Sequence, residues 1–312
     1  MPELPEVETV RAGLAPSLTG AKVTDVRVLD ERSLKRHQGG TADFMNSLQG
    51  CRIEAVVRRG KFLWLPLTAH DDRFKSPVAL VGHLGMSGQM LLRDVGAEPD
   101  KLTRVVISAI ESSGQPVEFR FVDQRIFGSL AIDDLVTTSD SKPGGFSAGA
   151  LANSPLLGLI PRSAAHIARD PLDEDFDVAA VTAKFAKKNS GIKRVLLDQN
   201  LLSGIGNIYA DEALWRARLH YDQPAASLSK AKSRELLEHV RVILSDAVAE
   251  GGTSFDEQYK NVNGESGYFA VSLNAYGMTG RPCNRCGNPI KRDSWMNRGS
   301  HYCPRCQRLK IG

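Results

Sequence analysis

Residues 283–306 read CNRCGNPIKRDSWMNRGSHYCPRC. The segment holds four of the five cysteines of the 312-residue chain, in two CxxC pairs separated by sixteen residues: Cys283, Cys286, Cys303 and Cys306. Each CxxC turn can direct two thiolates toward one ion, and two such turns complete the tetrahedral shell that zinc prefers in structural sites. Two disulfides are the alternative, but they are rare in a chain without a secretion signal, because the cytosol keeps thiols reduced. The spacing predicts one structural Zn²⁺ per chain, holding a β-hairpin zinc ribbon.

The residues around these cysteines are strongly basic. Residues 281–312 contain eight Lys or Arg and one acidic residue, a formal charge of +7, whereas residues 1–280 contain 32 basic and 35 acidic residues, a charge of −3. The modest net charge of +4 therefore conceals a basic module. Such a module indicates a polyanionic partner.

Composition argues against a membrane protein. No stretch approaches the roughly 20 apolar residues of a membrane span. Three acidic residues, Glu3, Glu6 and Glu8, lie where a signal peptide would be basic and then apolar. With 42% hydrophobic positions the chain can bury more than one core. We expect a soluble cytosolic protein of several domains.

Hydrophobic periodicity separates a β-rich part from a helical part. Residues 5–14 predict a short helix, and about eight β-branched runs between residues 22 and 132, separated by Gly, Pro and Asp, predict a sandwich or barrel-like domain. Residues 133–165 are rich in Ser, Gly, Ala and Pro and are interpreted as an insertion or linker that leads to a hinge at 166–176. Beyond this point, further helices are expected at 177–187, 191–200, 207–217 and 229–250.

The start of the chain, MPELPEVE, allows a particular chemistry. Removal of Met1 would leave Pro2 with a secondary amine. An α-amino group of pKa near 8 is about 10% neutral at pH 7, against about 0.04% for an unperturbed lysine. Attack of this amine on a sugar carbon would form an iminium, which can act as an electron sink, and the Glu3 carboxylate could move a proton at the same centre. On local sequence alone, an ordinary exposed terminus is the better interpretation.

Six segments and the four-cysteine tail match a known pattern, in order along the chain. They are PELPEVE (2–8), RRGKFLWL (58–65), HLGMSG (83–88), DQRIFG (123–128), GIGNIYADEALWRA (204–217) and GESGYF (264–269). Together they resemble bacterial formamidopyrimidine-DNA glycosylase (Fpg), of the Fpg/endonuclease VIII family. The resemblance implies a multidomain α+β protein with an N-terminal β-sandwich and flanking helices, a helical helix-two-turn-helix domain and the four-Cys zinc ribbon.

The expected domains follow from this resemblance. Residues 1–135 would form the catalytic β-sandwich domain, and residues 136–176 the insertion and interdomain hinge. Residues 177–280 would form the helical DNA-binding domain, with a lesion-recognition loop at 252–268, and residues 281–312 the zinc ribbon.

The resemblance also implies the roles of individual residues. Pro2 would be the Schiff-base nucleophile, Glu3 the proton donor or relay, and Lys61 the lysine of β-elimination. Arg298 would grip the phosphates at the lesion and assist the second elimination. Six further side chains would bind DNA, the first three by entering the duplex: Met86, Arg125, Phe127, Lys188, Lys193 and Asn207. Without the resemblance, Lys61, Lys188 and Lys193 would be interpreted as solvated lysines and Met86 and Phe127 as core, while Asn207 would be equally well a helix cap or a phosphate contact.

The implied activity is that of a bifunctional DNA glycosylase and AP lyase of base excision repair. It would remove oxidised purines, such as 8-oxoguanine and formamidopyrimidines, from duplex DNA and then cleave the strand by β,δ-elimination. No nucleotide or redox cofactor is required, and we expect a monomer in the bacterial cytoplasm, associated with the nucleoid. The alternatives are an endonuclease VIII-like enzyme for oxidised pyrimidines, a non-catalytic zinc-dependent DNA-binding protein and, more weakly, an RNA-directed ribbon protein.

Three departures from the family pattern concern binding geometry. DQRIFG stands where DPRRFG is more common, so Ile126 replaces a second arginine. Leu102 and Arg104 occupy positions where many relatives have histidine. The stretch at 138–160 is also longer than usual. None of these changes removes a predicted catalytic group.

Overall fold

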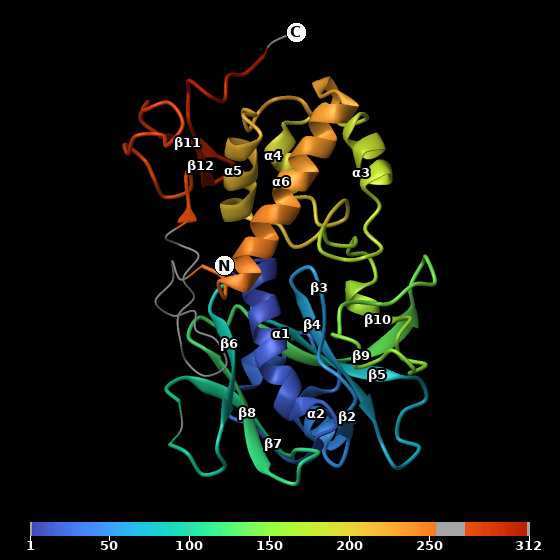
Figure 1. The fold of residues 1–312 in the computed structure, drawn as a ribbon. Helices are drawn as coiled ribbons and strands as arrows, with labels where there is room; N and C mark the ends of the chain where they lie inside the picture. The colour runs from blue at the N-terminus through green and yellow to red at the C-terminus, as the bar shows by residue number, and fades with distance from the viewer. Residues whose placement is uncertain (1, 99, 254–271, 311–312) are drawn as a thin grey trace. The chain divides into compact units, whose positions relative to one another are not determined.

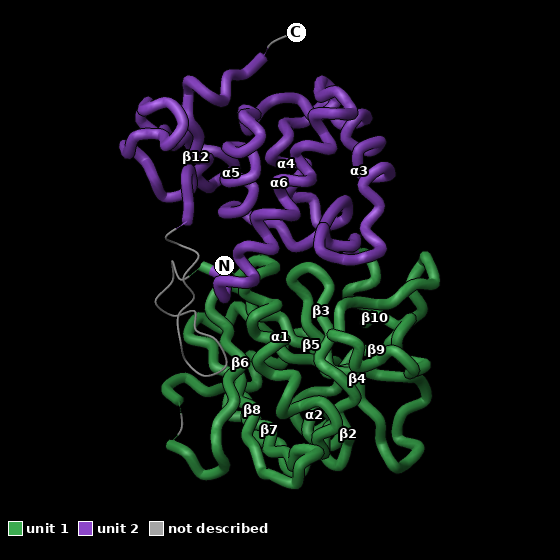
Figure 2. Tube along the Cα trace, in the orientation of Figure 1, with its two compact units in different colours: residues 1–166, 253–267 green, residues 167–252, 268–312 purple. Residues whose placement is uncertain are grey.

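The computed structural model describes residues 2–98, 100–253 and 272–310. It divides into two compact units, residues 1–166 with 253–267 and residues 167–252 with 268–312 (Figure 2). The boundary at residue 166 falls inside the predicted hinge. Among the described residues, none of the helices combines the length and apolarity that a membrane crossing requires.

Unit 1 is built on a ten-stranded, antiparallel arrangement of strands (Figure 1). The strands are β1 (Lys22–Val28), β2 (Arg52–Ile53), β3 (Val57–Arg59), β4 (Phe62–Thr68), β5 (Val78–His83), β6 (Gly88–Arg93), β7 (Thr103–Ile110), β8 (Pro116–Asp123), β9 (Ser129–Thr137) and β10 (Leu159–Pro161). Their order is β10-β9-β5-β4-β2-β1-β7-β8-β6, with β3 paired to β4. The predicted β-rich domain is confirmed.

Helix α1 (Leu4–Leu18) is longer than the predicted 5–14 segment. Its apolar face, including Val7, Val10 and Leu14, is buried in the main core of unit 1. The helix contacts β3 and β4 as well as β6, which lie toward opposite ends of the strand order. The start of the chain is therefore fixed to the sheet by a large apolar surface.

Two short helical segments between β1 and β2 were not predicted. They are a 3₁₀ turn, η1 (Glu31–Leu34), and α2 (Gly40–Leu48). Only two residues of α2, Phe44 and Leu48, are buried, so the apolar period is too short to be recognised in the sequence.

The segment interpreted as an insertion is partly built into the sheet. β10 pairs with the end of β9, with Leu159 opposite Thr137, and is followed by the 3₁₀ turn η2 (Arg162–Ala164). Phe146 forms a separate antiparallel bridge with Arg58. Residues 136–166 therefore belong to unit 1.

Unit 2 contains the predicted helices. They are α3 (Val178–Phe185), α4 (Ile192–Leu196), α5 (Asn207–Arg216) and α6 (Lys230–Ala249), with the 3₁₀ turn η3 (Ala225–Ser227) between α5 and α6. The hydroxyl of Ser229 caps α6 by accepting from the amide of Lys232, at 3.1 Å. The helix α4 ends four residues before the predicted limit of residue 200.

The C-terminal hairpin of unit 2 consists of β11 (Lys291–Trp295) and β12 (Arg298–Tyr302). Its two-residue turn, Met296–Asn297, has positive φ at both positions, as a type I′ turn requires. The ribbon hairpin expected between the two CxxC pairs is confirmed.

Candidate functional site

The first residues of the chain are held in place by one carboxylate. Pro2 is buried and directly precedes Glu3, the N-cap of α1. The amide of Glu3 donates to Oε2 of Glu6 at 2.8 Å. The other oxygen, Oε1 of Glu6, accepts from the amide and the hydroxyl of Thr253, at 2.8 and 2.9 Å. Glu6 thus ties the position of Pro2 to Thr253, the second residue of the predicted lesion-recognition loop at 252–268. The rest of that loop, like GESGYF, lies outside the described residues.

Lys61 lies in the two-residue turn between β3 and β4. Gly60, at the first turn position, has a φ of 55°, which suits a tight hairpin and favours glycine. The turn presents Lys61 at the end of the hairpin, where it is half-buried.

Sequence reasoning missed a histidine close to this lysine. His83 ends β5, and its pKa is lowered to about 4 by burial and by the positive charges of Arg36, Lys35 and Lys61. The ring is therefore neutral near pH 7. Its Nδ1 accepts from the amide of Gly85 at 3.1 Å, which leaves the proton on Nε2. His83 belongs to HLGMSG, so a histidine in a motif already singled out was the available signal.

The loops that carry Met86, Arg125 and Phe127 are joined by one buried aspartate. Oδ1 of Asp123 accepts from the Ser87 hydroxyl at 2.6 Å and from the amides of Arg125 and Ile126 at 3.1 and 3.0 Å. Oδ2 accepts from the amide of Gly128 at 2.7 Å. Asp123 is fully buried. One side chain therefore sets the relative positions of both loops.

The three predicted intercalating side chains lie together in unit 1 and are exposed. Met86 is 39% and Phe127 is 41% exposed, a high value for large apolar residues. The guanidinium of Arg125 lies 4.6 Å from the centroid of the Phe127 ring. Exposure and stacking suit side chains that replace a base in the duplex.

Two departures from the family pattern share an unusual backbone. Leu102 and Ile126 have φ values of 69° and 55°, in the left-handed region that L side chains rarely adopt. Leu102 is connected to the same loop, because its carbonyl accepts from the amide of Asp123 at 3.2 Å. Two strained backbone positions are therefore connected to the loop that carries Arg125 and Phe127.

Two of the predicted site residues of unit 2, Asn207 and Arg298, lie near the ribbon turn. Arg298 is exposed and is the first residue after the turn, opposite Trp295. Asn207 begins α5, and its Nδ2 donates to the carbonyl of Gly299 at 3.1 Å. Asn207 and Arg298 therefore lie on adjoining elements. Lys188 is exposed, with its ammonium 3.6 Å from Asp198.

Lys193, which the resemblance expects to bind DNA, is enclosed by the protein. Its side chain is fully buried, and its ammonium lies 2.6 Å from Oδ1 of Asp211. It also donates to the Ser300 hydroxyl at 3.0 Å and to the Gly299 carbonyl at 3.2 Å. A phosphate cannot reach an ammonium that is enclosed by the protein and already paired. These contacts join α4 to the ribbon strand β12 and to α5.

A second buried carboxylate of α5 was also missed. Glu212 accepts from the amides of Asn274, Ala275 and Tyr276, with distances of 2.7–3.1 Å. Burial raises the pKa of this carboxyl group, and the three amides oppose that shift. Glu212 fixes the described chain that leads into the ribbon. Within GIGNIYADEALWRA only Asn207 was singled out, because an acidic pair on a helix ordinarily indicates a solvated face.

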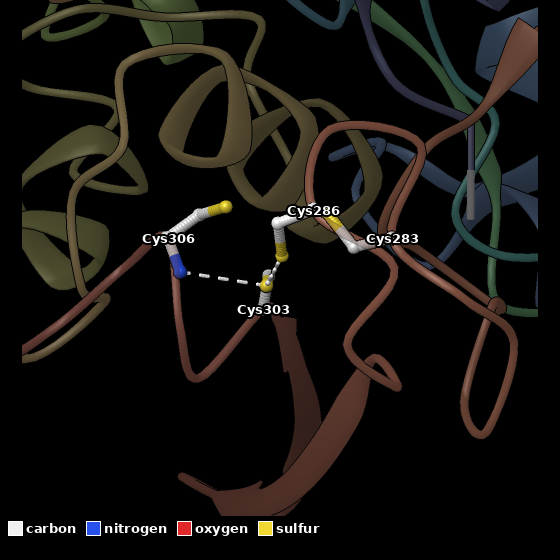
Figure 3. Close-up of side chains that lie close together, drawn as sticks. All are labelled: Cys283, Cys286, Cys303 and Cys306. Carbon is white, nitrogen blue, oxygen red and sulfur yellow. Dashed lines mark hydrogen bonds between the residues drawn. The ribbon is translucent and has the colours of Figure 1, made fainter.

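The four cysteines of the ribbon converge (Figure 3). All four Sγ atoms lie within 4.8 Å of one another, and those of Cys286 and Cys303 are 3.4 Å apart. A tetrahedral zinc with Zn–S bonds of about 2.3 Å requires S–S separations of about 3.8 Å. The donor set therefore fits Zn²⁺, and four thiolates leave no position for a substrate.

Trp215 of α5 connects this cluster to the helices. Its Nε1 donates to Sγ of Cys283 at 3.4 Å, and the guanidinium of Arg285 lies 4.1 Å from its ring. A hydrogen bond to a ligand sulfur orients the thiolate and stabilises its negative charge.

Comparison with known proteins covers nearly the whole chain. Residues 1–130 match the formamidopyrimidine-DNA glycosylase N-terminal domain, residues 167–258 its H2TH domain, and residues 280–309 the zinc finger found in FPG and IleRS. A formamidopyrimidine-DNA glycosylase of Leifsonia xyli is 55% identical over 99% of this chain and 100% of its own length.

Solved structures agree with these matches. A variant of Lactococcus lactis FPG in complex with a Fapy-dG containing DNA has a TM-score of 0.79 and 30% identity, covering 98% of this chain and 100% of its own. Lactococcus lactis Fpg with an abasic site containing DNA has a TM-score of 0.77 and 29% identity, covering 98% and 99%.

Proposed function

This chain belongs to the formamidopyrimidine-DNA glycosylase family, and from that membership we propose how its own residues perform base excision on oxidised purines in duplex DNA. The observation that carries the proposal is the arrangement in unit 1, where Pro2 is held at the start of α1 in the same compact unit as Lys61 and the exposed trio. Its substrate is chromosomal DNA, so its place of action is the bacterial cytoplasm, at the nucleoid.

The reaction begins at the first residue of the mature chain. Once Met1 is removed, the neutral amine of Pro2 attacks C1′ of the damaged nucleotide, the C1′–N bond breaks and the base leaves with a proton. Glu3 relays protons as the sugar ring opens and the iminium forms. The capping of α1 through Glu6 keeps Pro2 and Glu3 in a constant relation to each other.

Strand cleavage follows from the iminium. Loss of a C2′ proton to a base passes the C–H electrons to the iminium nitrogen as an enamine; their return breaks the C3′–O bond, expels the 3′ phosphate and restores the iminium. Loss of a C4′ proton then breaks the C5′–O bond in the same way and expels the 5′ phosphate. Lys61 exchanges the protons of these steps and binds a flanking phosphate. Water then hydrolyses the imine, so the products are a released sugar fragment and a one-nucleotide gap with phosphates at both ends.

DNA binding is divided between phosphate contacts and duplex insertion. Exposed Lys188 and Arg298, together with Asn207 at the start of α5, bind phosphates, and the Nε2–H of His83 adds a neutral donor beside Lys61. Met86, Arg125 and Phe127 fill the space that the extruded nucleotide leaves. Lys193 acts indirectly, by holding the ribbon strand that carries Arg298.

The zinc is structural in this scheme. Cys283, Cys286, Cys303 and Cys306 would hold it, and bound Zn²⁺ supplies folding free energy to a ribbon too small to form a core of its own. The chemical steps use the amine, carboxylate and ammonium groups of unit 1.

A borohydride-trapping experiment tests the function. An 8-oxoguanine·C duplex is incubated with the wild type, Pro2→Gly and Lys61→Ala, after intact mass has confirmed that Met1 is absent. We expect a covalent adduct with the wild type and none with Pro2→Gly, while Lys61→Ala retains trapping on an abasic-site duplex but cleaves it slowly. Tight binding without an adduct would favour the non-catalytic DNA-binding protein. Faster turnover of thymine glycol than of 8-oxoguanine would favour the endonuclease VIII alternative.

A further inference from the structure

A buried carboxylate on α1 is shared between two arginines. Oε2 of Glu8 accepts from Nε of Arg58 at 2.8 Å, and Oε1 lies 2.8 Å from Nη2 of Arg11. All three residues are less than 8% exposed. Because a buried charge is stable only when it is paired, the two guanidinium groups and the carboxylate depend on one another for their positions.

Arg58 extends this connection to the turn that carries Lys61. It lies on β3, two residues before Gly60, and its Nη1 donates to the Gly60 carbonyl at 3.3 Å. The path from α1 to the Lys61 turn is therefore short: Glu8, Arg58 and the peptide unit next to Lys61.

The edge of β3 that does not pair with β4 is held by the long segment at 138–160. Arg58 and Phe146 exchange two backbone hydrogen bonds, at 3.0 and 2.8 Å. Nη2 of Arg59 donates to the carbonyl of Pro143 at 3.3 Å, and the guanidinium of Arg11 lies 5.0 Å from the Phe146 ring. Residues 143–146 thus contact both arginines of β3 and the arginine that shares Glu8.

Close packing at Gly145 makes this attachment specific. A Cβ at this position would lie 2.5 Å from the Arg58 carbonyl oxygen and 2.6 Å from the Trp64 ring, so a larger residue would displace the segment. At Gly158 of the same segment, a Cβ would meet nothing within 4 Å.

We propose that Glu8, Arg58 and residues 143–146 form a brace that positions Lys61 for strand cleavage. The inference rests on the proposed function, since it assigns these residues to the lysine of elimination. Pro2 and Glu3 are held separately, through Glu6 and Thr253. Loosening the brace therefore moves Lys61 while the nucleophile stays in place, so it slows elimination more than Schiff-base formation.

The test compares these two steps in single turnover on an abasic-site duplex. The variants are Glu8→Gln, which removes the shared charge, and Gly145→Ala, which displaces the segment. Gly158→Ala is the matched control for the segment. Glu118→Gln is the control for loss of a buried ion pair, because Glu118 lies 2.7 Å from Arg120 on β8 and has no part in the brace.

We expect Glu8→Gln and Gly145→Ala to slow strand cleavage at least about tenfold, with borohydride trapping and the Kd for DNA within about twofold of the wild type. Arg58→Lys, which keeps the charge, should recover part of the cleavage rate that Arg58→Met loses. Equal losses of trapping and cleavage, or the same imbalance in either control, would overturn the proposal. If Glu8→Gln fails to fold, Gly145→Ala decides the question. A wild type that forms no adduct would instead refute the proposed function and the brace with it.

Discussion

The ammonium nitrogen of Lys193 lies 2.6 Å from Oδ1 of Asp211, and neither side chain is more than 1% exposed. Oδ2 of the same aspartate accepts from the amide of His301 at 2.9 Å, so the pair connects α4, α5 and β12. A buried ion pair of this kind costs desolvation of both charges, which makes it a weak source of stability. Breaking it on one side is nevertheless expensive, because the other charge remains buried and unpaired.

Lys193→Met should therefore lower the free energy of unfolding of the protein by about 3–5 kcal/mol. The double variant Lys193→Met/Asp211→Asn should recover part of that loss, since it removes the unpaired charge and keeps an acceptor for His301. Urea denaturation of the three proteins measures both effects. A loss below about 1 kcal/mol for Lys193→Met would mean that the pair does not control this part of unit 2.

The salt dependence of DNA binding separates Lys193 from Lys188. Each phosphate contact contributes a slope of about −0.9 to log K against log salt. Exposed Lys188 should lose this contribution when changed to Ala, whereas Lys193→Met should weaken binding with an unchanged slope. Titrations of a duplex at several salt concentrations supply the comparison. A reduced slope for Lys193→Met would restore the direct phosphate contact expected from the family resemblance.

Removal of zinc should unfold the ribbon and break its contacts with α5. Without the metal the four thiolates repel one another, so the hairpin loses its fold together with the contacts of Cys283 and Arg285 with Trp215. A strong chelator should change the tryptophan emission and weaken DNA binding, with both changes following the loss of zinc. The double variant Trp215→Phe/Trp295→Phe serves as the control, because it should bind zinc but lacks both tryptophans that report on the ribbon, Trp295 being the last residue of β11. Quantitative zinc loss with unchanged DNA affinity would contradict a structural role in binding.

The pH dependence of stability should reveal the buried His83. Its pKa in the folded protein is about 4, lowered by burial and by Arg36, Lys35 and Lys61, against 6.5 as the ordinary value. Between pH 6.5 and 4 the unfolded chain binds the proton and the folded protein does not, so stability is full above pH 6.5 and falls as the pH drops. The loss amounts to at most about 3 kcal/mol at pH 4. His83→Gln should remove it, which denaturation at pH 4–7 would show as a difference between the two curves. If the free energies of unfolding of the wild type and His83→Gln fall in parallel with pH, a group other than His83 is responsible for the loss.

Hydrophobic periodicity in the sequence predicted most helices and strands, but it did not predict the side-chain contacts that hold the site. Helix α6 was recognised because it buries one continuous apolar face, and strands such as β4 and β5 because they are unbroken runs of buried apolar residues, whereas α2 buries only Phe44 and Leu48. The role of Asp123 depends on two loops that meet only in the folded protein, so spacing along the chain does not predict it. Lys193 shows the same limit, because a lysine in a basic stretch carries no local sign that Asp211, eighteen residues later, will enclose it.

The left-handed conformation of Ile126 leads to a last prediction. A β-branched residue at a φ of 55° is strained, at a cost of about 1–2 kcal/mol. The contacts that shape this loop use the backbone: the Ile126 amide donates to Asp123 at 3.0 Å and its carbonyl accepts from Lys35 at 2.7 Å. Ile126→Asn should therefore raise the free energy of unfolding by about 1 kcal/mol and leave the excision rate unchanged, since asparagine tolerates this region. Asp123→Asn should instead lower both the free energy of unfolding and the excision rate. The NH₂ group of the new amide would face backbone N–H donors, so the two loops would no longer be held together. Denaturation and single-turnover excision of 8-oxoguanine measure the two variants together. A less stable Ile126→Asn would show that the packing of the isoleucine side chain outweighs its backbone strain.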